Sequence, residues 1–218
     1  MPDGRISRER MIKAQIAGRG IRSERVLRAM GQVPREEFVE PELDEFAYED
    51  GPLPISEGQT ISQPYIVALM VEAAEIGPTD QVLEVGTGSG YAAAVMSRVA
   101  ARVFTIERHA SLAETARQRF ARLGYDNVQV RVGDGTQGLL EAAPFQAILV
   151  AASGPMVPHA LKSQLALCGR LIIPVGQQYW RQRLHKVTRV SEAQYEDDDL
   201  GAVSFVPLIG AEPEDQRR

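Results

Sequence analysis

From Gln81 onward the chain alternates short apolar runs with helical patterns, and no other feature constrains its fold as strongly. The apolar runs are QVLEV, RVFTIE, VQVRV, FQAILVAA and RLIIPVG. The helical patterns between them are YAAAVMSRVA, SLAETARQRFARLG and a segment near 157–167. Strands that alternate with helices indicate a parallel sheet covered on both faces. The sequence therefore predicts an α/β fold with a Rossmann-like, doubly wound and mostly parallel sheet.

Weaker patterns flank this region. RLHKVTRV and GAVSFVPLI are predicted to form an antiparallel pair of strands that closes the sheet. A helix is predicted after EGQTISQP, because Ile66, Leu69, Met70 and Ala73 form one apolar stripe. Two short helices are predicted upstream, and the second begins after Ser23, a residue type that favours helix N-caps.

These patterns divide the chain into three parts. Residues 1–58 are predicted to form a helical segment packed on the main domain, and residues 59–210 to form the main domain itself. Residues 211–218, with the sequence AEPEDQRR, are predicted to be a disordered tail.

Composition excludes several classes of function. The formal net charge is −5, so no basic surface for DNA or RNA is expected. The single cysteine, Cys168, excludes an internal disulfide and a cysteine-based metal cluster, and no other metal-ligand spacing occurs. The start of the chain, MPDGRISRERMIKAQIAGRG, has neither the pattern of a signal peptide nor that of a membrane anchor. We expect a cytoplasmic protein, monomeric by default, without nucleic-acid or membrane partners.

The segment VLEVGTGSGYAAA places Gly86, Gly88 and Gly90 between a strand and a helix. A glycine loop there lets the backbone approach a ligand at the helix N-terminus. A dinucleotide-binding loop would have its third glycine at the position of Tyr91. Glu84 would also oppose a pyrophosphate, whereas its carboxylate suits the ammonium and sulfonium groups of S-adenosylmethionine. The loop therefore favours S-adenosylmethionine as the cofactor.

Polar residues around this loop suggest contacts for the rest of such a ligand. Thr87 and Ser89 offer hydroxyl groups near its amino-acid end. Glu107 ends the second strand 21 residues after Gly86, which matches the spacing of about 20 residues for an acid that binds a ribose hydroxyl. Asp134 follows the third strand between two glycines, where its carboxylate would accept from an adenine amino group.

Ser62, in the segment GQTISQP, has two interpretations from spacing alone. It is a plausible helix cap, because Pro64 and the apolar stripe follow it closely. Its hydroxyl would also suit a bound carboxylate, since a helix N-terminus carries a partial positive charge. The segment holds no His–Asp partner that would make Ser62 a covalent nucleophile.

Several segments occur in the order and spacing of one known family. They are GQTISQPYIVALM, VLEVGTGSGYAAAVMS, VFTIER, LGYDNVQVRVGDG, APFQAILVAA and CGRLIIPVG, with RAMGQVPREEFVEPE and VSFVPLIG near the ends. From about Arg19 to Gly210 the chain resembles the protein-L-isoaspartate O-methyltransferases, which are class I S-adenosylmethionine-dependent methyltransferases. The glycine loop is shared with many methyltransferases, but GQTISQP is much more specific to this family.

The resemblance implies a repair enzyme that methylates the misplaced α-carboxylate of L-isoaspartyl residues in damaged polypeptides. The ester then collapses to a succinimide, which reopens partly to normal aspartate. The resemblance implies Ser62 as the active-site serine. Together with the loop, it implies cofactor contacts at Gln59, Thr60, Ile61, Glu84, Gly86, Thr87, Gly88, Ser89, Glu107, Asp134 and Gly135. The implied substrate contacts are Ser62, Val203, Phe205 and Val206.

The chain departs from the family pattern at three places. Gln146 stands where the family usually has aspartate, AASGP at 151–155 replaces a TAAAP-like run, and Leu139 stands where an aromatic residue is common. The first two are expected at or near the crevice, so they bear on substrate preference more than on cofactor binding.

Two other functions stay open at this point. A small-molecule O-methyltransferase would use His159, at the start of the helix after the fourth strand, as its general base. A cofactor-binding homologue without catalysis would serve as a recognition module for isoaspartyl peptides. Of the remaining histidines, His109 is expected at the surface and His185 is expected to have a structural role.

Overall fold

The structure is a computed structural model that describes residues 4–177 and 180–210. The predicted tail at 211–218 lies outside the described residues. Across the described ranges, no helix is both long and apolar enough to cross a membrane.

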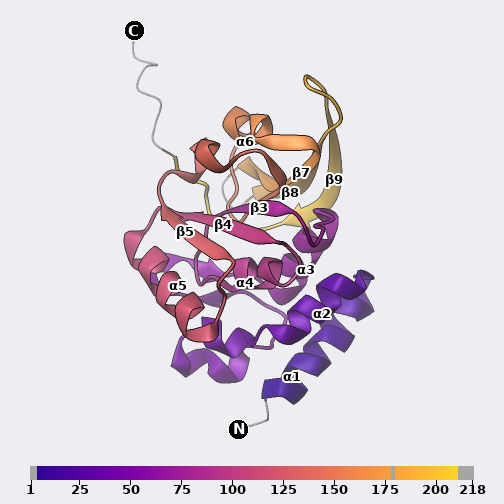
Figure 1. The fold of residues 1–218 in the computed structure, drawn as a ribbon. Coiled ribbons are helices and arrows are strands. Elements are labelled where there is room, and N and C mark those ends of the chain that lie inside the picture. Colours follow the sequence, from indigo (N-terminus) through magenta and orange to yellow (C-terminus); the bar gives the residue numbers. More distant parts are fainter. Residues whose placement is uncertain (1–3, 178–179, 211–218) are drawn as a thin grey trace.

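The chain begins with helical segments that lie at the bottom of the view in Figure 1. Helix α1 is Gly4–Arg10, a π-helical segment covers Met11–Ile16, and α2 is Glu24–Gln32. Ser23 caps α2 as predicted, because its side chain accepts a hydrogen bond from the backbone of Val26. Short 3-10 turns and an irregular connection then lead to the main sheet.

A seven-stranded sheet forms the centre of the molecule. Its strands are β3 (Gln81–Val85), β4 (Arg102–Glu107), β5 (Val128–Val132), β6 (Phe145–Val150), β7 (Leu165–Gln177), β8 (Trp180–Arg189) and β9 (Tyr195–Val203). They lie in the order β5-β4-β3-β6-β7-β8-β9. The pairs from β5 to β7 are parallel, whereas β8 pairs antiparallel with both β7 and β9. The predicted α/β class and the antiparallel closing pair are therefore confirmed.

Helices cover the two faces of the sheet unequally. They are α3 (Pro64–Ala73), α4 (Tyr91–Ser97), α5 (Ala110–Leu123) and α6 (His159–Ser163). Figure 1 shows α3, α4 and α5 on one face with α1 and α2 beyond them, and α6 on the other. The crossovers β3-α4-β4 and β4-α5-β5 place the first two helices after the glycine loop on the same side. This arrangement leaves the carboxyl ends of β3 and β4 beside α3.

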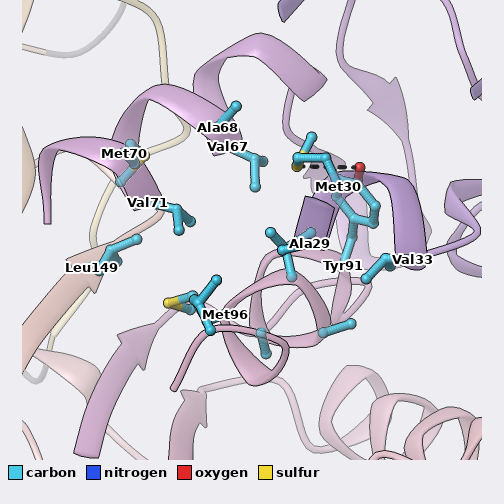
Figure 2. Close-up of a cluster of buried hydrophobic side chains, with 14 of the residues drawn as sticks. Ala29, Met30, Val33, Val67, Ala68, Met70, Val71, Tyr91, Met96 and Leu149 are labelled. Carbon is cyan, nitrogen blue, oxygen red and sulfur yellow. Dashed lines mark hydrogen bonds between the residues drawn. The ribbon is translucent and has the colours of Figure 1, made fainter. Parts of the chain in front are cut away.

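Side chains alternate between these faces along each strand. In β3, Val82 packs with the helices α3 to α5, whereas Leu83 and Val85 pack toward α6. Buried residues of 1–58, such as Met30, belong to the same hydrophobic cluster as α3 and α4 (Figure 2). The boundary between a segment 1–58 and a domain 59–210 stays a prediction.

Tyr91, the first residue of α4, ties the glycine loop to this core. Its ring is 1% exposed and meets the edge of Phe38, with the ring centroids 5.7 Å apart. The buried guanidinium of Arg35 lies 4.8 Å from the Tyr91 ring centroid. The Tyr91 hydroxyl points to the sulphur of Met30 on α2 (Figure 2), at 3.9 Å. A third loop glycine at this position would leave this part of the core unfilled.

The last strand differs from its prediction. β9 covers Tyr195–Val203, rather than GAVSFVPLI at 201–209. The strand carries a run of acidic side chains, which find partners on β8: Asp199 pairs with Arg183, and Asp197 lies 2.7 Å from His185. β9 is an edge strand, and charged residues there prevent pairing with other chains. Helix α6 is also shorter than the predicted 157–167.

Candidate active site

The carboxyl ends of β3 and β4 open onto a cavity of about 730 Å³, a volume typical of small-molecule sites. Ligands of open α/β sheets bind at this edge. The predicted site residues that line it are Gln59, Thr60, Ile61, Ser62, Glu84, Gly86, Thr87, Gly88, Ser89, Glu107, Gly135, Val203, Phe205 and Val206. One wall is the loop after β3, a second is the segment before α3, and a third is the chain that leaves β9.

Asp134 is not among the residues that line the cavity. Its carboxylate accepts hydrogen bonds from the amide of Thr136 at 2.9 Å and from the hydroxyl of Thr136 at 2.7 Å. Asp134 therefore caps the 3-10 turn Gly135–Gln137. Its contact with an adenine stays a prediction.

Glu107, at the end of β4, is 5% exposed and is fixed by two backbone amides. The amide of Gly88 donates to Oε2 at 2.9 Å, and the amide of His109 donates to Oε1 at 3.0 Å. These bonds join the carboxylate to the glycine loop. The loop and the predicted ribose-binding acid therefore form one hydrogen-bonded unit.

Glu84 is buried beneath the loop, with 2% of its surface exposed. Thr105, its partner in the register of β3 and β4, donates from Oγ1 to Oε2 of Glu84 at 2.5 Å. The hydroxyls of Thr105 and Thr87 lie 2.6 Å apart. Burial raises the pKa of Glu84 to about 8, with the Thr105 bond acting against this shift and the charge of Glu107 adding to it. A cation in the cavity would favour the ionised form.

Two glycines of the site are required by close packing. Gly90 has a φ of 90°, and a Cβ atom there would lie 2.7 Å from Cζ of Phe120. A Cβ atom at Gly135 would overlap the side chain of Val85. Gly90 therefore lets the start of α4 pack closely on α5, and Gly135 keeps the turn after β5 close to the end of β3.

Ser62 is half-buried and lines the cavity beside Gln63. It follows β2 (Thr60–Ile61), which pairs with β1 (Leu53–Pro54). Helix α3 begins at Pro64 with Gln63 as its N-cap residue, and the Gln63 side chain makes no cap bond. The helix-cap interpretation of Ser62 is therefore wrong, because the proline at the first helical position sets the start one residue later.

The segment after β9 is held by two elements that are distant in sequence. The buried side chain of Gln182 on β8 accepts from the amide of Phe205 at 2.6 Å and donates to its carbonyl at 3.1 Å. On the other side, the amide of Ser153 donates to the carbonyl of Val206 at 2.8 Å, and the amide of Leu208 donates to the carbonyl of Ser153 at 2.8 Å. These bonds hold the backbone at 203–208 along the cavity.

Gln146 does not lie at the crevice, so the predicted position of this residue is wrong. Its side chain accepts from the amide of Gln81 at 2.8 Å, at the amino ends of β6 and β3, which is the edge of the sheet away from the cavity. The run 151–155 does reach the crevice, because Ala151 and Ala152 line it. Gln146 therefore has a structural role, whereas 151–155 bears on the site.

Sequence reasoning missed several residues that line the cavity. They include Arg19, Tyr65 and His109, the last of which was expected at the surface. Arg19 and Tyr65 lie far apart in sequence, so no spacing rule joins them. His159 is exposed and is not among the lining residues, so it is poorly placed to act as a base there.

Comparison with known proteins identifies the family. The model of the protein-L-isoaspartate(D-aspartate) O-methyltransferase family matches residues 6–213. The chain belongs to this family. A protein-L-isoaspartate O-methyltransferase from Methylorubrum populi is 58% identical over 203 residues, 93% of this chain and 95% of the relative. Another, from Pelobacter propionicus, is 57% identical over 205 residues, 94% of this chain and 91% of the relative.

Solved structures of isoaspartyl methyltransferases share the fold. A protein-L-isoaspartate O-methyltransferase superposes with a TM-score of 0.83 at 31% identity, covering 93% of this chain and 66% of that one. A beta-aspartate methyltransferase of this family from Plasmodium falciparum, in complex with S-adenosyl-L-homocysteine, gives a TM-score of 0.79 at 28% identity and covers 93% and 98%.

Proposed function

We propose that this chain transfers a methyl group from S-adenosylmethionine to the free α-carboxylate of L-isoaspartyl residues in damaged proteins or peptides, which initiates repair through a succinimide. One observation carries the proposal. The family-specific segment that contains Ser62 and the glycine loop with Glu84 line the same cavity. A carboxylate acceptor and a cationic methyl donor would therefore meet between them.

The residues present fit this cofactor. The buried carboxyl of Glu84 lies beneath the loop, where a ligand ammonium or sulfonium group would offset the unfavourable burial of its charge. Glu107 would accept from ribose hydroxyls, and Gln59 to Ile61 would cover the ligand from the opposite wall. When bound, S-adenosylmethionine supplies a methyl group on a positively charged sulphur.

Ser62 would act by orientation rather than as a nucleophile. Its hydroxyl donates no hydrogen bond to the described residues, so it is available to one oxygen of the substrate carboxylate. The second oxygen is left to act as the nucleophile. Holding two reactants in line supplies roughly 7–11 kcal/mol in favourable cases, which accounts for catalysis without a covalent intermediate.

Proton removal would not be needed. An α-carboxyl group has a pKa of about 3.3–3.7, so it is ionised near pH 7. The candidate base of the alternative reading, His159, is exposed on α6. This placement supports the carboxylate acceptor over a hydroxyl acceptor that needs a general base.

The substrate backbone would lie along Val203, Phe205 and Val206. Gln182 occupies both backbone groups of Phe205, so this residue cannot pair with the peptide as a strand would. Main-chain pairing would be left to groups other than those of Phe205 and the Val206 carbonyl, which already accepts from Ser153, and Phe205 would contribute its side chain. An isoaspartyl residue adds one carbon to the peptide backbone, which an extended track of this kind would register.

The direct test incubates the protein with methyl-labelled cofactor and a matched pair of peptides, one isoaspartyl and one aspartyl. Label on the isoaspartyl peptide alone supports the proposal. Equal labelling of both peptides would refute the specificity. Binding of the isoaspartyl peptide by calorimetry without label transfer would identify the inactive recognition module instead.

We also infer a monomer in the cytoplasm that acts on isoaspartyl polypeptides. The single cysteine supports this location, and the formal net charge of −5 supports a polypeptide substrate over a nucleic acid. Light scattering of the purified protein tests the monomer, and a mass of two chains would contradict it.

A further inference from the structure

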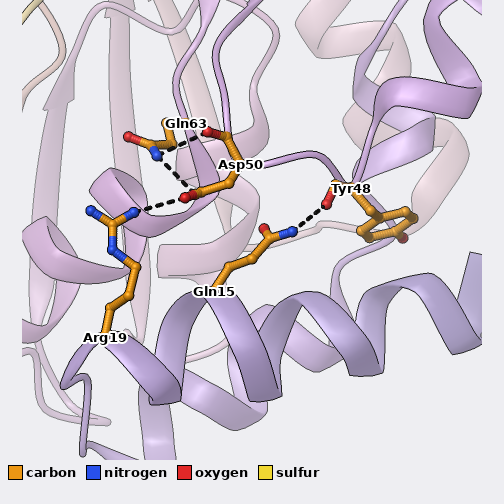
Figure 3. A network of polar contacts seen from close by, with 5 residues as sticks. All are labelled: Gln15, Arg19, Tyr48, Asp50 and Gln63. Atoms are coloured by element: carbon orange, nitrogen blue, oxygen red, sulfur yellow. Dashed lines mark hydrogen bonds and ion pairs between the residues drawn. The ribbon is translucent and has the colours of Figure 1, made fainter.

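Three segments that are distant in sequence meet at Asp50 and Gln63, and Gln63 directly follows Ser62 in the chain (Figure 3). Arg19 is the last residue of the 3-10 turn Ala17–Arg19, and its Nη1 donates to Oδ2 of Asp50 at 2.8 Å. The other carboxylate oxygen of Asp50, Oδ1, accepts from Nε2 of Gln63 at 2.8 Å, and its carbonyl accepts from the same nitrogen at 3.1 Å. One aspartate therefore links the first helices to the start of α3.

Arg19 makes a second contact with α3. Its guanidinium carbon lies 3.6 Å from the ring centroid of Tyr65, a residue in the first turn. Arg19, Gln63 and Tyr65 all line the cavity with Ser62. The residue after Ser62 is thus bonded to Asp50, and Tyr65 is stacked on Arg19.

This network takes the place of a helix cap. The N-cap residue of α3, Gln63, forms no side-chain cap bond, because its amide reaches Asp50 instead. The direction in which the chain enters α3 sets where the hydroxyl of Ser62 points. That direction is fixed by Arg19 and Asp50, which are separated from it by long stretches of chain.

The charges of this network argue against a role for Arg19 in simply attracting the anionic substrate carboxylate. Arg19 and Asp50 form a closed ion pair, so together they present no net charge to a carboxylate substrate. Their side chains are 44% and 34% exposed, and exposed pairs of this kind contribute little to stability. Geometry is the remaining contribution of the pair at this site.

We propose that Arg19, acting through Asp50, Gln63 and Tyr65, is a positioning residue that orients Ser62 for methyl transfer to the isoaspartyl carboxylate. The proposal rests on the proposed function of the site. It assigns to the N-terminal segment a part in catalysis, besides its packing against the main domain.

The experiment compares steady-state methylation of an isoaspartyl peptide by the wild type, Arg19→Ala, Arg19→Lys and Asp50→Asn. We expect Arg19→Ala and Asp50→Asn each to lower kcat about 10-fold, while the affinity for S-adenosylhomocysteine by calorimetry changes less than twofold. Arg19→Lys should recover only part of the loss, because lysine lacks the planar fork that pairs and stacks at once. Arg122→Ala on α5, which breaks the exposed 2.7 Å pair of Arg122 with Glu37, is the matched control and should retain full kcat.

Asp50→Asn separates positioning from electrostatic attraction. If Arg19 merely attracted an anionic substrate, the loss of Asp50 would unmask its charge and lower KM with kcat unchanged. That result would overturn the proposal. Hydrogen exchange gives a readout independent of activity. The backbone amides of residues 61–63, 65 and 66 should exchange faster in Arg19→Ala and Asp50→Asn than in the wild type, and unchanged exchange would also contradict the proposal.

A double-mutant comparison with Ser62 completes the test. Arg19→Ala should cost less than twofold in kcat when Ser62 is already alanine, because the group that it positions is gone. Full multiplication of the two losses would overturn the positioning role while leaving the proposed function intact. A wild-type protein that fails to methylate the peptide would refute the proposed function itself. Should Arg19→Ala fail to fold, Asp50→Asn carries the same comparison.

Discussion

The hydroxyl of Thr105 donates a hydrogen bond of 2.5 Å to the buried carboxyl of Glu84, its direct neighbour across β3 and β4. Thr87 extends this chain of hydroxyls to the glycine loop, because its Oγ1 lies 2.6 Å from that of Thr105. Ionisation of Glu84 is thereby linked to the loop that would hold the cofactor. The protein without its cofactor keeps an acid with a pKa of about 8 at the centre of the site.

Glu84 should therefore make the ligand-free protein less stable as the pH rises. Its folded-state pKa lies above its ordinary value of about 4.3, so between that value and about 8 the folded state binds more protons than the unfolded state. The free energy of unfolding must then fall with rising pH through this window. Glu84→Gln should raise stability at pH 8 by roughly 1–3 kcal/mol and have little effect at pH 4.5. Denaturant titrations at both pH values check this, with Glu114→Gln on the exposed surface of α5 as the control.

Binding of the cofactor should release a proton from Glu84 near neutral pH. A cationic ligand favours the carboxylate, so affinity for S-adenosylmethionine should rise between pH 6 and 7.5, by up to about tenfold per pH unit. Calorimetry in two buffers of different ionisation enthalpy measures the proton directly. Proton release should disappear in Glu84→Gln, and equal release by that variant would show that another group titrates.

Gln182 should control the peptide side of the cavity without affecting the cofactor side. Gln182→Met leaves the amide and carbonyl of Phe205 without their partner, at a cost of about 1–3 kcal/mol if both stay buried. We expect KM for the isoaspartyl peptide to rise about 10-fold, with calorimetric affinity for S-adenosylhomocysteine unchanged. Gln194→Met, at an exposed position, is the matched control. An unchanged KM would mean that the segment after β9 needs no such support.

Ser153 offers a stabilising substitution within the family departure at 151–155. Its hydroxyl is buried and has no hydrogen-bond partner among the described residues, whereas its backbone groups are both bonded. Ser153→Ala removes a buried polar group without creating a cavity, so it should raise the free energy of unfolding by about 0.5–1 kcal/mol. Thermal unfolding measures this. Destabilisation of more than about 1 kcal/mol would show that the hydroxyl is bonded through water.

The central strands could be read from the sequence because their signals are local. The three runs between Gln81 and Val132 are short and rich in valine and isoleucine, and the structure has β3, β4 and β5 at the predicted residues. The bounds of β9 could not be predicted in this way. Its acidic side chains pair with basic side chains on β8, and no local sequence pattern reveals that pairing. Charged residues have low β-propensity, but they are tolerated in β9 because it lies at the edge of the sheet.

The site shows the same division. The glycine loop and Ser62 were recognisable because their residues are contiguous, whereas Arg19, Asp50 and Gln182 act through partners that only the fold brings near. Gln146 shows the reverse error: its place in a family motif suggested the crevice, but the amino end of β6 lies at the other edge of the sheet. Helix α3 lacked a side-chain cap because proline and the Asp50 network fix its start.

The pH dependence of kcat for the wild type and Ser62→Ala, at saturating cofactor and isoaspartyl peptide, tests the central claim most directly. If Ser62 orients an acceptor that is already ionised, kcat should be nearly flat between pH 6 and 8 for both proteins. Ser62→Ala should then raise the activation free energy of methyl transfer by on the order of 2–4 kcal/mol, as the loss of one oxyanion donor does. A wild-type kcat that rises tenfold per pH unit, or a Ser62→Ala variant as fast as the wild type, would contradict the account.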